Sequence, residues 1–212
     1  MPTPRLLQGT PGAGGSVHGP IWTLPAQGPA PTVPVRGGGT PASNAHDALE
    51  ALAGARAQLE ELGARRQAAG DTMGAEIFAS QALMAADPTL LGAVEAAASA
   101  GRTAAEALQV AGEEQAAVFA AIPDEYLAAR AADVRDVAGR AVRILLGATT
   151  PLPAEPSIVV ADDLPPSIGA EIPRELLLGI ALRGGSRTAH AVILARAAGI
   201  PCIVATAGLS ID

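Results

Sequence analysis

Residues 184–201 read GGSRTAHAVILARAAGIP and lie between two short apolar runs, 176–181 and 202–205. Paired glycines mark a turn, and the apolar residues that follow them recur with the period of a helix. Gly199 and Pro201 end that helix, because glycine suits the position after a helix C-terminus and proline cannot continue the helix. The stretch therefore predicts a strand, a glycine turn, a helix and a second strand.

His190 falls in the first turn of this helix, which we expect to begin near Thr188. Such a turn carries unpaired backbone N–H groups and a partial positive charge, which attract phosphate and keep an imidazole neutral. A neutral imidazole is a nucleophile that can accept a phosphoryl group, and nearby arginines would contact its oxygens. On the residues alone, a structural role for His190 at the start of the helix is the simpler interpretation.

The same run resembles the phosphohistidine signature of PEP-utilising enzymes, G-G-x-T-x-H-x-x-I-x-A-R-x-x-x-I-P. That group includes Enzyme I of the sugar phosphotransferase system, PEP synthase and pyruvate phosphate dikinase. Ser186 stands where a second glycine is usual. The resemblance implies that His190 is the phosphorylated residue and that the phosphate is cradled by Gly184, Gly185, Arg187, Thr188 and Arg196.

The composition excludes several other classes of protein. Apolar residues make up 49% of the 212 positions and aromatic ones only 2%, so the core must be built from Ala, Leu, Val and Ile. The net charge of −7 argues against nonspecific nucleic-acid binding. No apolar run approaches the ~18 residues of a membrane-spanning helix, and no signal peptide is expected.

The single cysteine, Cys202, rules out an internal disulfide and fits a reducing compartment, so we expect a cytoplasmic protein. Since Cys202 lies in a predicted strand, we interpret it as a small buried residue. The sequence stops at Asp212, directly after a predicted strand. We therefore expect the chain to be part of a longer protein.

The order of the patterns predicts an α/β domain interrupted by a helical one. The α/β domain would comprise residues 1–24 and 148–212 and be incomplete at its C-terminus, with a proline-rich linker over 25–42 and helices over 43–147. The glycine-rich segment 9–15 is expected to be a turn; it is not a P-loop, because no Gly-Lys-Ser/Thr follows it. The expected strands are 5–9, 18–24, 157–161, 176–181 and 202–205.

Capping signals divide the helical domain into four or five helices. Gly63 would interrupt the first helix or end it nearby. The last two helices are expected over 103–121 and 125–146. The expected N-terminal caps of the first three are Ser43 or Asn44, then Asp71, then Asp87 with Pro88 at the first helical position.

Residues 124–137, DEYLAARAADVRDV, resemble the D-E-Y-L-x-x-R-A-x-D-V-R-D-I segment of Enzyme I. Residues 77–87 follow its I-F-x-x-H-x-x-x-x-x-D helix, with Gln81 in place of the usual histidine. PEP synthase and the dikinase lack this helical insertion, so the resemblance selects Enzyme I and implies that the helical domain docks the phosphocarrier protein HPr. The docking groove would then be lined by Leu83, Met84, Leu90, Tyr126 and Arg130.

Each of these docking residues has a structural alternative. The leucines and the methionine are equally well explained as core residues, whereas Tyr126 is amphipathic and suits an interface. Arginines of the last helix are equally well explained as partners of its own carboxylates. Those arginines are Arg130, Arg135 and Arg140, and the carboxylates are Asp133 and Asp136.

Residues 161–167, ADDLPPS, resemble the A-x-D-L-x-P-S turn of Enzyme I. The family has a threonine shortly after this turn that hydrogen-bonds the active histidine, and Gly169 occupies that place here. The resting orientation of His190 must then come from another group, for which Thr188 and a water molecule are both candidates.

Taken together, the resemblance implies an α/β phosphohistidine (swivelling) domain with an inserted all-helical HPr-binding domain. It implies an enzyme that carries a phosphoryl group from phosphoenolpyruvate, through His190, to HPr. In the family, phosphoenolpyruvate and Mg²⁺ bind to a barrel that these residues do not include. We therefore expect no cofactor or metal within this chain, and a homodimer only for the full-length protein.

Two alternatives remain open on the sequence. The first is the Enzyme I-like module of the multidomain phosphoryl donor for dihydroxyacetone kinase, which carries a similar N-terminal region. The second is a noncatalytic helical module that binds a partner for regulation and in which His190 is only structural.

Overall fold

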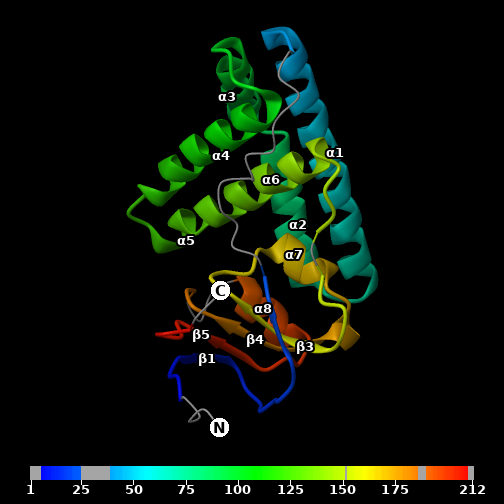
Figure 1. Ribbon diagram of the computed structural model, residues 1–212, viewed down its shortest axis with the longest axis vertical. Coiled ribbons are helices and arrows are strands. Elements are labelled where there is room, and N and C mark those ends of the chain that lie inside the picture. Colours follow the sequence, from blue (N-terminus) through cyan, green and yellow to red (C-terminus); the bar gives the residue numbers. More distant parts are fainter. Residues whose placement is uncertain (1–5, 25–38, 151, 186–189, 210–212) are drawn as a thin grey trace. The chain divides into compact units, whose positions relative to one another are not determined.

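In the computed structural model, the described residues are 6–24, 39–150, 152–185 and 190–209. They divide into two compact units (Figure 1). The first unit combines the two ends of the chain, 1–26 and 151–212, and the second is the segment 27–150 between them. The first unit contains the sheet and the second is helical, which confirms the predicted α/β fold with a helical insertion.

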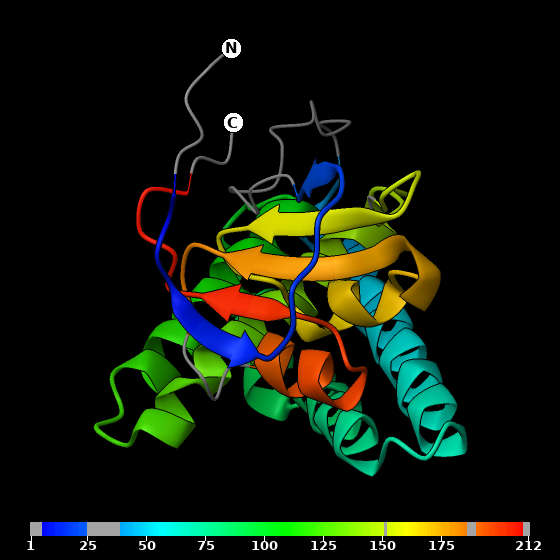
Figure 2. The same ribbon diagram turned by 90° about the horizontal axis from the view of Figure 1, so that it is seen from below.

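The described residues of the first unit contain five strands, which form one sheet in the order β1-β5-β4-β3-β2 (Figure 2). Neighbouring strands are parallel except β1 and β5, which are antiparallel. The two N-terminal strands therefore occupy the two edges of a sheet whose three central strands come from the C-terminal part of the chain. The strands are β1 (Thr10–Ala13), β2 (Ile21–Thr23), β3 (Ser157–Ala161), β4 (Leu177–Leu182) and β5 (Cys202–Val204).

Short helices connect the parallel strands. Helix α7 (Pro166–Glu171) and the 3₁₀ turn η1 (Arg174–Leu176) join β3 to β4, and α8 (His190–Ala197) joins β4 to β5. One face of α8 is buried in the core of the unit with residues of β3, β4 and β5. Parallel strands buried in this way read as continuous apolar runs, which is how β3 and β4 appear in the sequence.

Six helices are described in the second unit. Helix α1 runs for 28 residues, and its buried residues recur every three or four positions, so that one face covers the rest of the unit. Helices α2, α3, α4 and α6 pack on it and on one another. The bounds are α1 (Pro41–Ala68), α2 (Thr72–Ala85), α3 (Pro88–Ser99), α4 (Ala104–Ala120), α5 (Glu125–Ala128) and α6 (Arg130–Leu145).

The structure confirms most of the predicted caps. Asp71 accepts a hydrogen bond from the Gly74 N–H at 2.9 Å, and Asp87 accepts one from the Thr89 N–H at 2.7 Å. Thr103, which was not among the predicted caps, caps α4 in a reciprocal capping box with Glu106, and the hydrogen bond from the Thr103 backbone lowers the pKa of the Glu106 carboxyl.

The predicted cap of α1 was wrong. Thr40, and not Ser43 or Asn44, accepts the capping hydrogen bond, which the Ser43 N–H donates at 3.2 Å. Pro41 takes the first helical position, so the helix begins inside the segment that the sequence suggested as a linker. Residues 25–38 of that predicted linker lie outside the described part of the chain.

The first strand and the glycine-rich turn were also misplaced. Residues 6–9 are not in a strand, and β1 occupies the segment predicted as a turn. Gly12 lies in this strand, and a Cβ there would come within 2.9 Å of the Val192 side chain and 3.2 Å of the Cys202 sulfur. The glycine thus serves close packing rather than a turn.

Two predictions within the helical unit were wrong as well. Gly63 neither interrupts nor ends α1, and it is buried where α1 packs against Phe78 of α2. The helix predicted over 125–146 is divided at Ala129 into the single turn α5 and the longer α6. No glycine or proline marks this division, so the sequence carried no signal for it.

Within the described residues, no single helix is both long and apolar enough to span a membrane. Helices α2 and α3 together reach the required length and composition, but they are bent by 44° at their junction.

Candidate functional site

The candidate site lies at the carboxyl edge of the parallel strands. β3, β4 and β5 all end there, and the turns that follow them are joined by backbone hydrogen bonds. The Gly184 N–H donates to the Asp162 carbonyl at 2.9 Å, and the Ala205 N–H donates to the Gly184 carbonyl at 2.9 Å. This edge is where open α/β sheets bind their ligands.

Both glycines of the turn after β4 are required by its geometry. A Cβ on Gly184 would lie 3.1 Å from the Asp162 carbonyl oxygen, and Gly185 has a φ of 84°. Ala205, directly after β5, has a φ of 51° although it is not glycine. Residues held in such conformations cluster at functional edges, which supports a site at this place.

Helix α8 brings His190 to this edge. It connects β4 to the parallel strand β5, so it runs back along the sheet and its N-terminal end faces the carboxyl edge. His190 is the first described residue of α8, but its side chain lies outside the described structure. The same holds for Ser186, Arg187 and Thr188, so the roles expected of these side chains stay predictions.

Packing fixes α8 against the sheet. Ala191, Val192 and Ala195 are buried and lie on one face of the helix. The absence of a side chain at Gly12 lets β1 approach Val192 closely. Any residue in the first turn of α8 is thus held at a defined place relative to the glycine turn.

The structure gives Arg196 a contact that the sequence did not predict. This residue is six positions after His190, about 9 Å further along the helix axis. Its Nε donates to the Gly12 carbonyl at 2.7 Å and so joins the end of α8 to β1. Arg196 therefore stabilises the position of the helix, and its expected contact with the phosphate stays a prediction.

Three further residues of the α/β unit were considered in the sequence analysis, namely His18, Cys202 and Gly169. His18 is exposed in the segment between β1 and β2. Cys202 is buried, and burial raises the pKa of its thiol to about 11, so the reactive thiolate is scarce at neutral pH. Gly169 lies in α7 beside Leu164, and a Cβ there would be in ordinary contact with Leu164 at 3.4 Å.

In the helical unit, the five predicted docking residues divide into two groups. Leu83 is 73% exposed and Tyr126 is 69% exposed, and the half-buried Met84 packs against a small cluster formed by α4 and α6. Leu90 is only 4% exposed, so it belongs to the core and not to an accessible groove. Its apolar character alone could not distinguish the two roles.

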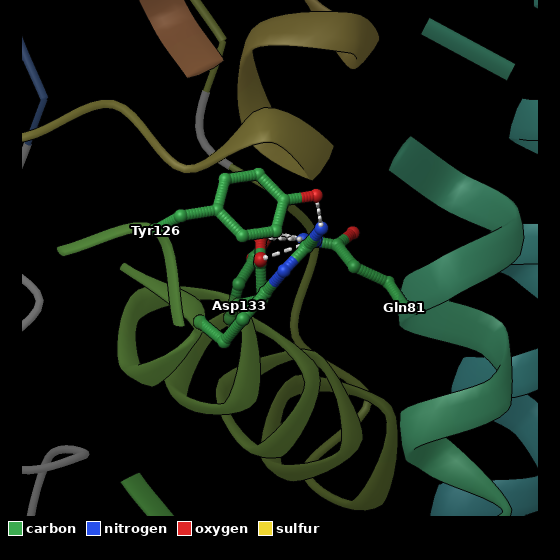
Figure 3. A network of polar contacts seen from close by, with 5 residues as sticks. Gln81, Tyr126 and Asp133 are labelled. Carbon is green, nitrogen blue, oxygen red and sulfur yellow. Dashed lines mark hydrogen bonds and ion pairs between the residues drawn. The ribbon is translucent and has the colours of Figure 1, made fainter. Parts of the chain in front are cut away.

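Arg130 connects the exposed Tyr126 to the buried Asp133. Its Nη1 lies 3.2 Å from Asp133, as the ion-pair alternative predicted, and its Nη2 donates to the Tyr126 hydroxyl at 2.5 Å (Figure 3). The guanidinium carbon lies 4.9 Å from the centre of the Tyr126 ring. Arg130 therefore holds the tyrosine while part of its own side chain remains accessible.

The other two arginines have partners that the sequence did not predict. Arg135 forms a bidentate pair with Glu113 of α4 at 2.7 and 2.8 Å, which lowers the pKa of the Glu113 carboxyl. Arg140 donates to Gln58 of α1 at 2.7 Å. Pairs between helices depend on tertiary packing, so local spacing could not identify them.

Two family models match the chain. The model of the PEP-utilising enzyme N-terminal region matches residues 8–130, and that of the PEP-utilising enzyme mobile domain matches residues 153–212.

The chain belongs to the PEP-utilising enzymes.

Curated relatives within the PEP-utilising enzymes carry the name phosphoenolpyruvate-protein phosphotransferase. The protein of that name from Streptomyces coelicolor is 39% identical over 172 residues, which cover 77% of this chain and 30% of the relative. The one from Bacillus subtilis is 37% identical over 164 residues, covering 74% of this chain and 28% of the relative. The chain thus matches less than a third of the length of these relatives.

Solved structures of PEP-utilising enzymes show the same fold. The N-terminal domain of the nitrogen Enzyme I matches with a TM-score of 0.67 and 27% identity, over 96% of this chain and 85% of that one. A solution structure of Enzyme I matches with a TM-score of 0.66 and 27% identity, over 96% and 84%. The helical insertion that the sequence pointed to is therefore shared with Enzyme I.

Metal binding was expected elsewhere in a longer protein. Within residues 6–24, 39–150, 152–185 and 190–209, no three His, Cys, Asp or Glu side chains are grouped so that they could hold a metal ion.

Proposed function

We propose that this chain is the N-terminal part of a phosphoenolpyruvate-protein phosphotransferase, in which His190 carries a phosphoryl group from phosphoenolpyruvate to HPr. The observation that supports this most strongly is the glycine turn at the carboxyl edge of the sheet, followed by a helix that starts at His190, in a PEP-utilising enzyme. The relatives bear the name of this activity.

The proposed mechanism is a double displacement. A neutral ring nitrogen of His190 attacks phosphorus in line, an N–P bond forms, and the P–O bond to pyruvate enolate breaks. A histidine of HPr then attacks the same phosphorus and releases His190. Backbone N–H groups of the glycine turn and the first turn of α8, with Arg187 and Thr188, would stabilise the phosphoryl oxygens.

The two units would have separate tasks. The α/β unit would be the phosphohistidine domain, and the helical unit would dock HPr through Leu83, Met84, Tyr126 and Arg130. Phosphoenolpyruvate and Mg²⁺ would be bound by a barrel in the remainder of a longer protein, which would form the homodimer. We further infer that the protein works in sugar transport in the cytoplasm, where its substrate and HPr are found.

The relatives favour this function over the phosphoryl donor of dihydroxyacetone kinase, because they carry the phosphotransferase name. A purely regulatory helical module remains a distinct alternative, in which HPr binds and His190 is never phosphorylated. The two are separated by a direct assay of phosphorylation.

The test is phosphorylation of the chain by phospho-HPr. We expect an acid-labile phosphoryl group on the wild type and none on His190→Ala, with HPr affinity unchanged in the variant. The chain contains three histidines, so His18→Ala and His46→Ala, both at exposed positions, are matched controls that should be phosphorylated normally.

Labelled phosphoenolpyruvate with Mg²⁺ should leave the isolated chain unlabelled, since the barrel is missing. A wild type that binds HPr but accepts no phosphate would support the regulatory module instead. Efficient labelling by phosphoenolpyruvate alone would show that the division of tasks proposed here is wrong.

A further inference from the structure

A chain of hydrogen bonds connects the interior of the helical unit to its surface (Figure 3). The Gln81 side-chain amide of α2 donates to Asp133 Oδ1 of α6 at 3.1 Å. Asp133 Oδ2 accepts from Arg130 Nη1 at 3.2 Å, and Arg130 Nη2 donates to the Tyr126 hydroxyl of α5 at 2.5 Å. Four side chains from three helices thus form one continuous relay.

Exposure rises steadily along this relay. Gln81 and Asp133 are fully buried, the Arg130 side chain is 20% exposed, and Tyr126 is 69% exposed. Each of the two Asp133 oxygens accepts from a different donor, so the carboxylate fixes the direction of Arg130 relative to α2. Buried hydrogen bonds to a carboxylate are strong and directional, whereas the exposed ring has little packing of its own to hold it.

Glutamine is an unusual residue type at a fully buried position such as 81. Its amide nitrogen also donates to Asp136 at 3.3 Å, while its buried amide oxygen has no hydrogen-bond partner among the described residues. A buried acceptor without a partner lowers stability. The residue is therefore best explained by its two N–H donors, which connect α2 to both carboxylates of α6.

We propose that Gln81 is a positioning residue for partner docking: through Asp133 and Arg130 it fixes the orientation of the exposed Tyr126 ring. The inference rests on the proposed function, in which Tyr126 and Arg130 meet HPr. It adds that a residue with no exposed surface controls how the partner is recognised. A ring held in one orientation loses less conformational entropy on binding than a free one.

The orientation of the ring can be measured without any partner. Tyr126 is the only tyrosine, so the chain labelled with 3-fluorotyrosine carries a single ¹⁹F probe at this position. We expect Gln81→Leu to shift or broaden this resonance. Gln58→Leu, which removes a different glutamine hydrogen bond between helices, should leave it unchanged.

Arg130→Lys provides a second variant at a partly exposed position, in case Gln81→Leu fails to fold. Lysine keeps the charge beside Asp133 but lacks the planar fork that reaches Asp133 and Tyr126 together. It should move the ¹⁹F resonance as well. An unchanged resonance in folded Gln81→Leu would overturn the inference, and so would an unchanged resonance in Arg130→Lys if Gln81→Leu does not fold.

A double-mutant cycle measures the coupling in HPr affinity. Tyr126→Phe removes only the hydroxyl that Arg130 contacts, and Gln81 is not in direct contact with it. We expect each single variant to weaken binding about three- to thirty-fold, and the double variant to be no weaker than the worse single, as for residues in one network.

Additive losses would overturn the inference while leaving the proposed function intact, because the wild type would still bind HPr. Absence of HPr binding by the wild type would refute the proposed docking function and, with it, this extension. The ¹⁹F measurement distinguishes the two cases, since it reports the relay alone.

Discussion

Gly169 shows most directly how one residue could limit the chemistry. It occupies the place where the resemblance expects a threonine beside the active histidine. A Cβ at this position would meet Leu164 at 3.4 and 3.5 Å, which is ordinary van der Waals contact, so a Cβ can be accommodated.

We predict that Gly169→Thr increases the rate at which His190 accepts phosphate from phospho-HPr, by up to about fivefold for one hydrogen bond of about 1 kcal/mol. The measurement is a single-turnover transfer assay. Gly169→Val has the same branched shape without the hydroxyl, and it should not increase the rate. Equal rates in all three proteins would show that His190 takes its orientation from another group.

Single residues also show which properties could not be predicted from the sequence. The signature placed Arg196 near the phosphate, but its Nε contacts the Gly12 carbonyl of β1. Leu90 had the apolar character of a docking residue, but it is buried. Both outcomes depend on neighbours from distant parts of the chain, which the residue type alone does not identify.

Two glycines in helices show how elements are fitted together. Gly112 is buried in α4, and a Cβ there would lie 2.4 Å from the Ala138 Cβ of α6, closer than atoms can pack. Gly92 is exposed in α3, and a Cβ there would meet nothing within 4 Å. The first glycine permits a close helix contact and the second does not serve one.

We predict that Gly112→Ala lowers the free energy of unfolding by about 1–3 kcal/mol, because α4 must move away from α6. Gly92→Ala should instead raise it by about 0.5–1 kcal/mol, because alanine favours the helix and meets no neighbour. Urea titrations followed by circular dichroism at 222 nm measure both. The prediction fails if the two substitutions shift the midpoint in the same direction.

At the level of elements, the caps of α2 and α3 were predictable because a cap is a local interaction between residues two or three positions apart. The division between α5 and α6 was not, because no residue near Ala129 disfavours a helix. The relay through Gln81 was also missed. Its only trace in the sequence was a polar residue at an apolar position of α2.

The whole molecule consists of two units with separate hydrophobic cores, one around the sheet and one among the helices. The unfolding of each unit can be followed by a different spectroscopic signal. Trp22 is the only tryptophan and lies in β2, whereas most helical residues belong to the second unit.

We predict that a core substitution lowers the stability of its own unit and leaves the other nearly unchanged, as for distant independent sites. Gly112→Ala should shift the unfolding midpoint that circular dichroism reports. It should leave the midpoint reported by Trp22 fluorescence unchanged. Gly12→Ala would place a Cβ against Val192 and Cys202. It should lower the unfolding midpoint reported by Trp22 fluorescence more than the midpoint reported by circular dichroism. Coincident shifts of both signals in both variants would mean that the units unfold together.

The sequence by itself determined the fold class and the family signature around His190, and it located most helices and strands. These are properties of short segments, in which periodicity, capping and motif spacing act over a few residues. The tertiary structure alone decided that segment 10–13 is a strand, that Arg196 contacts β1, and that Gln81 is connected to Tyr126. Those outcomes depend on which distant segments pack together, and no local pattern records the identity of a neighbour that lies far away along the chain.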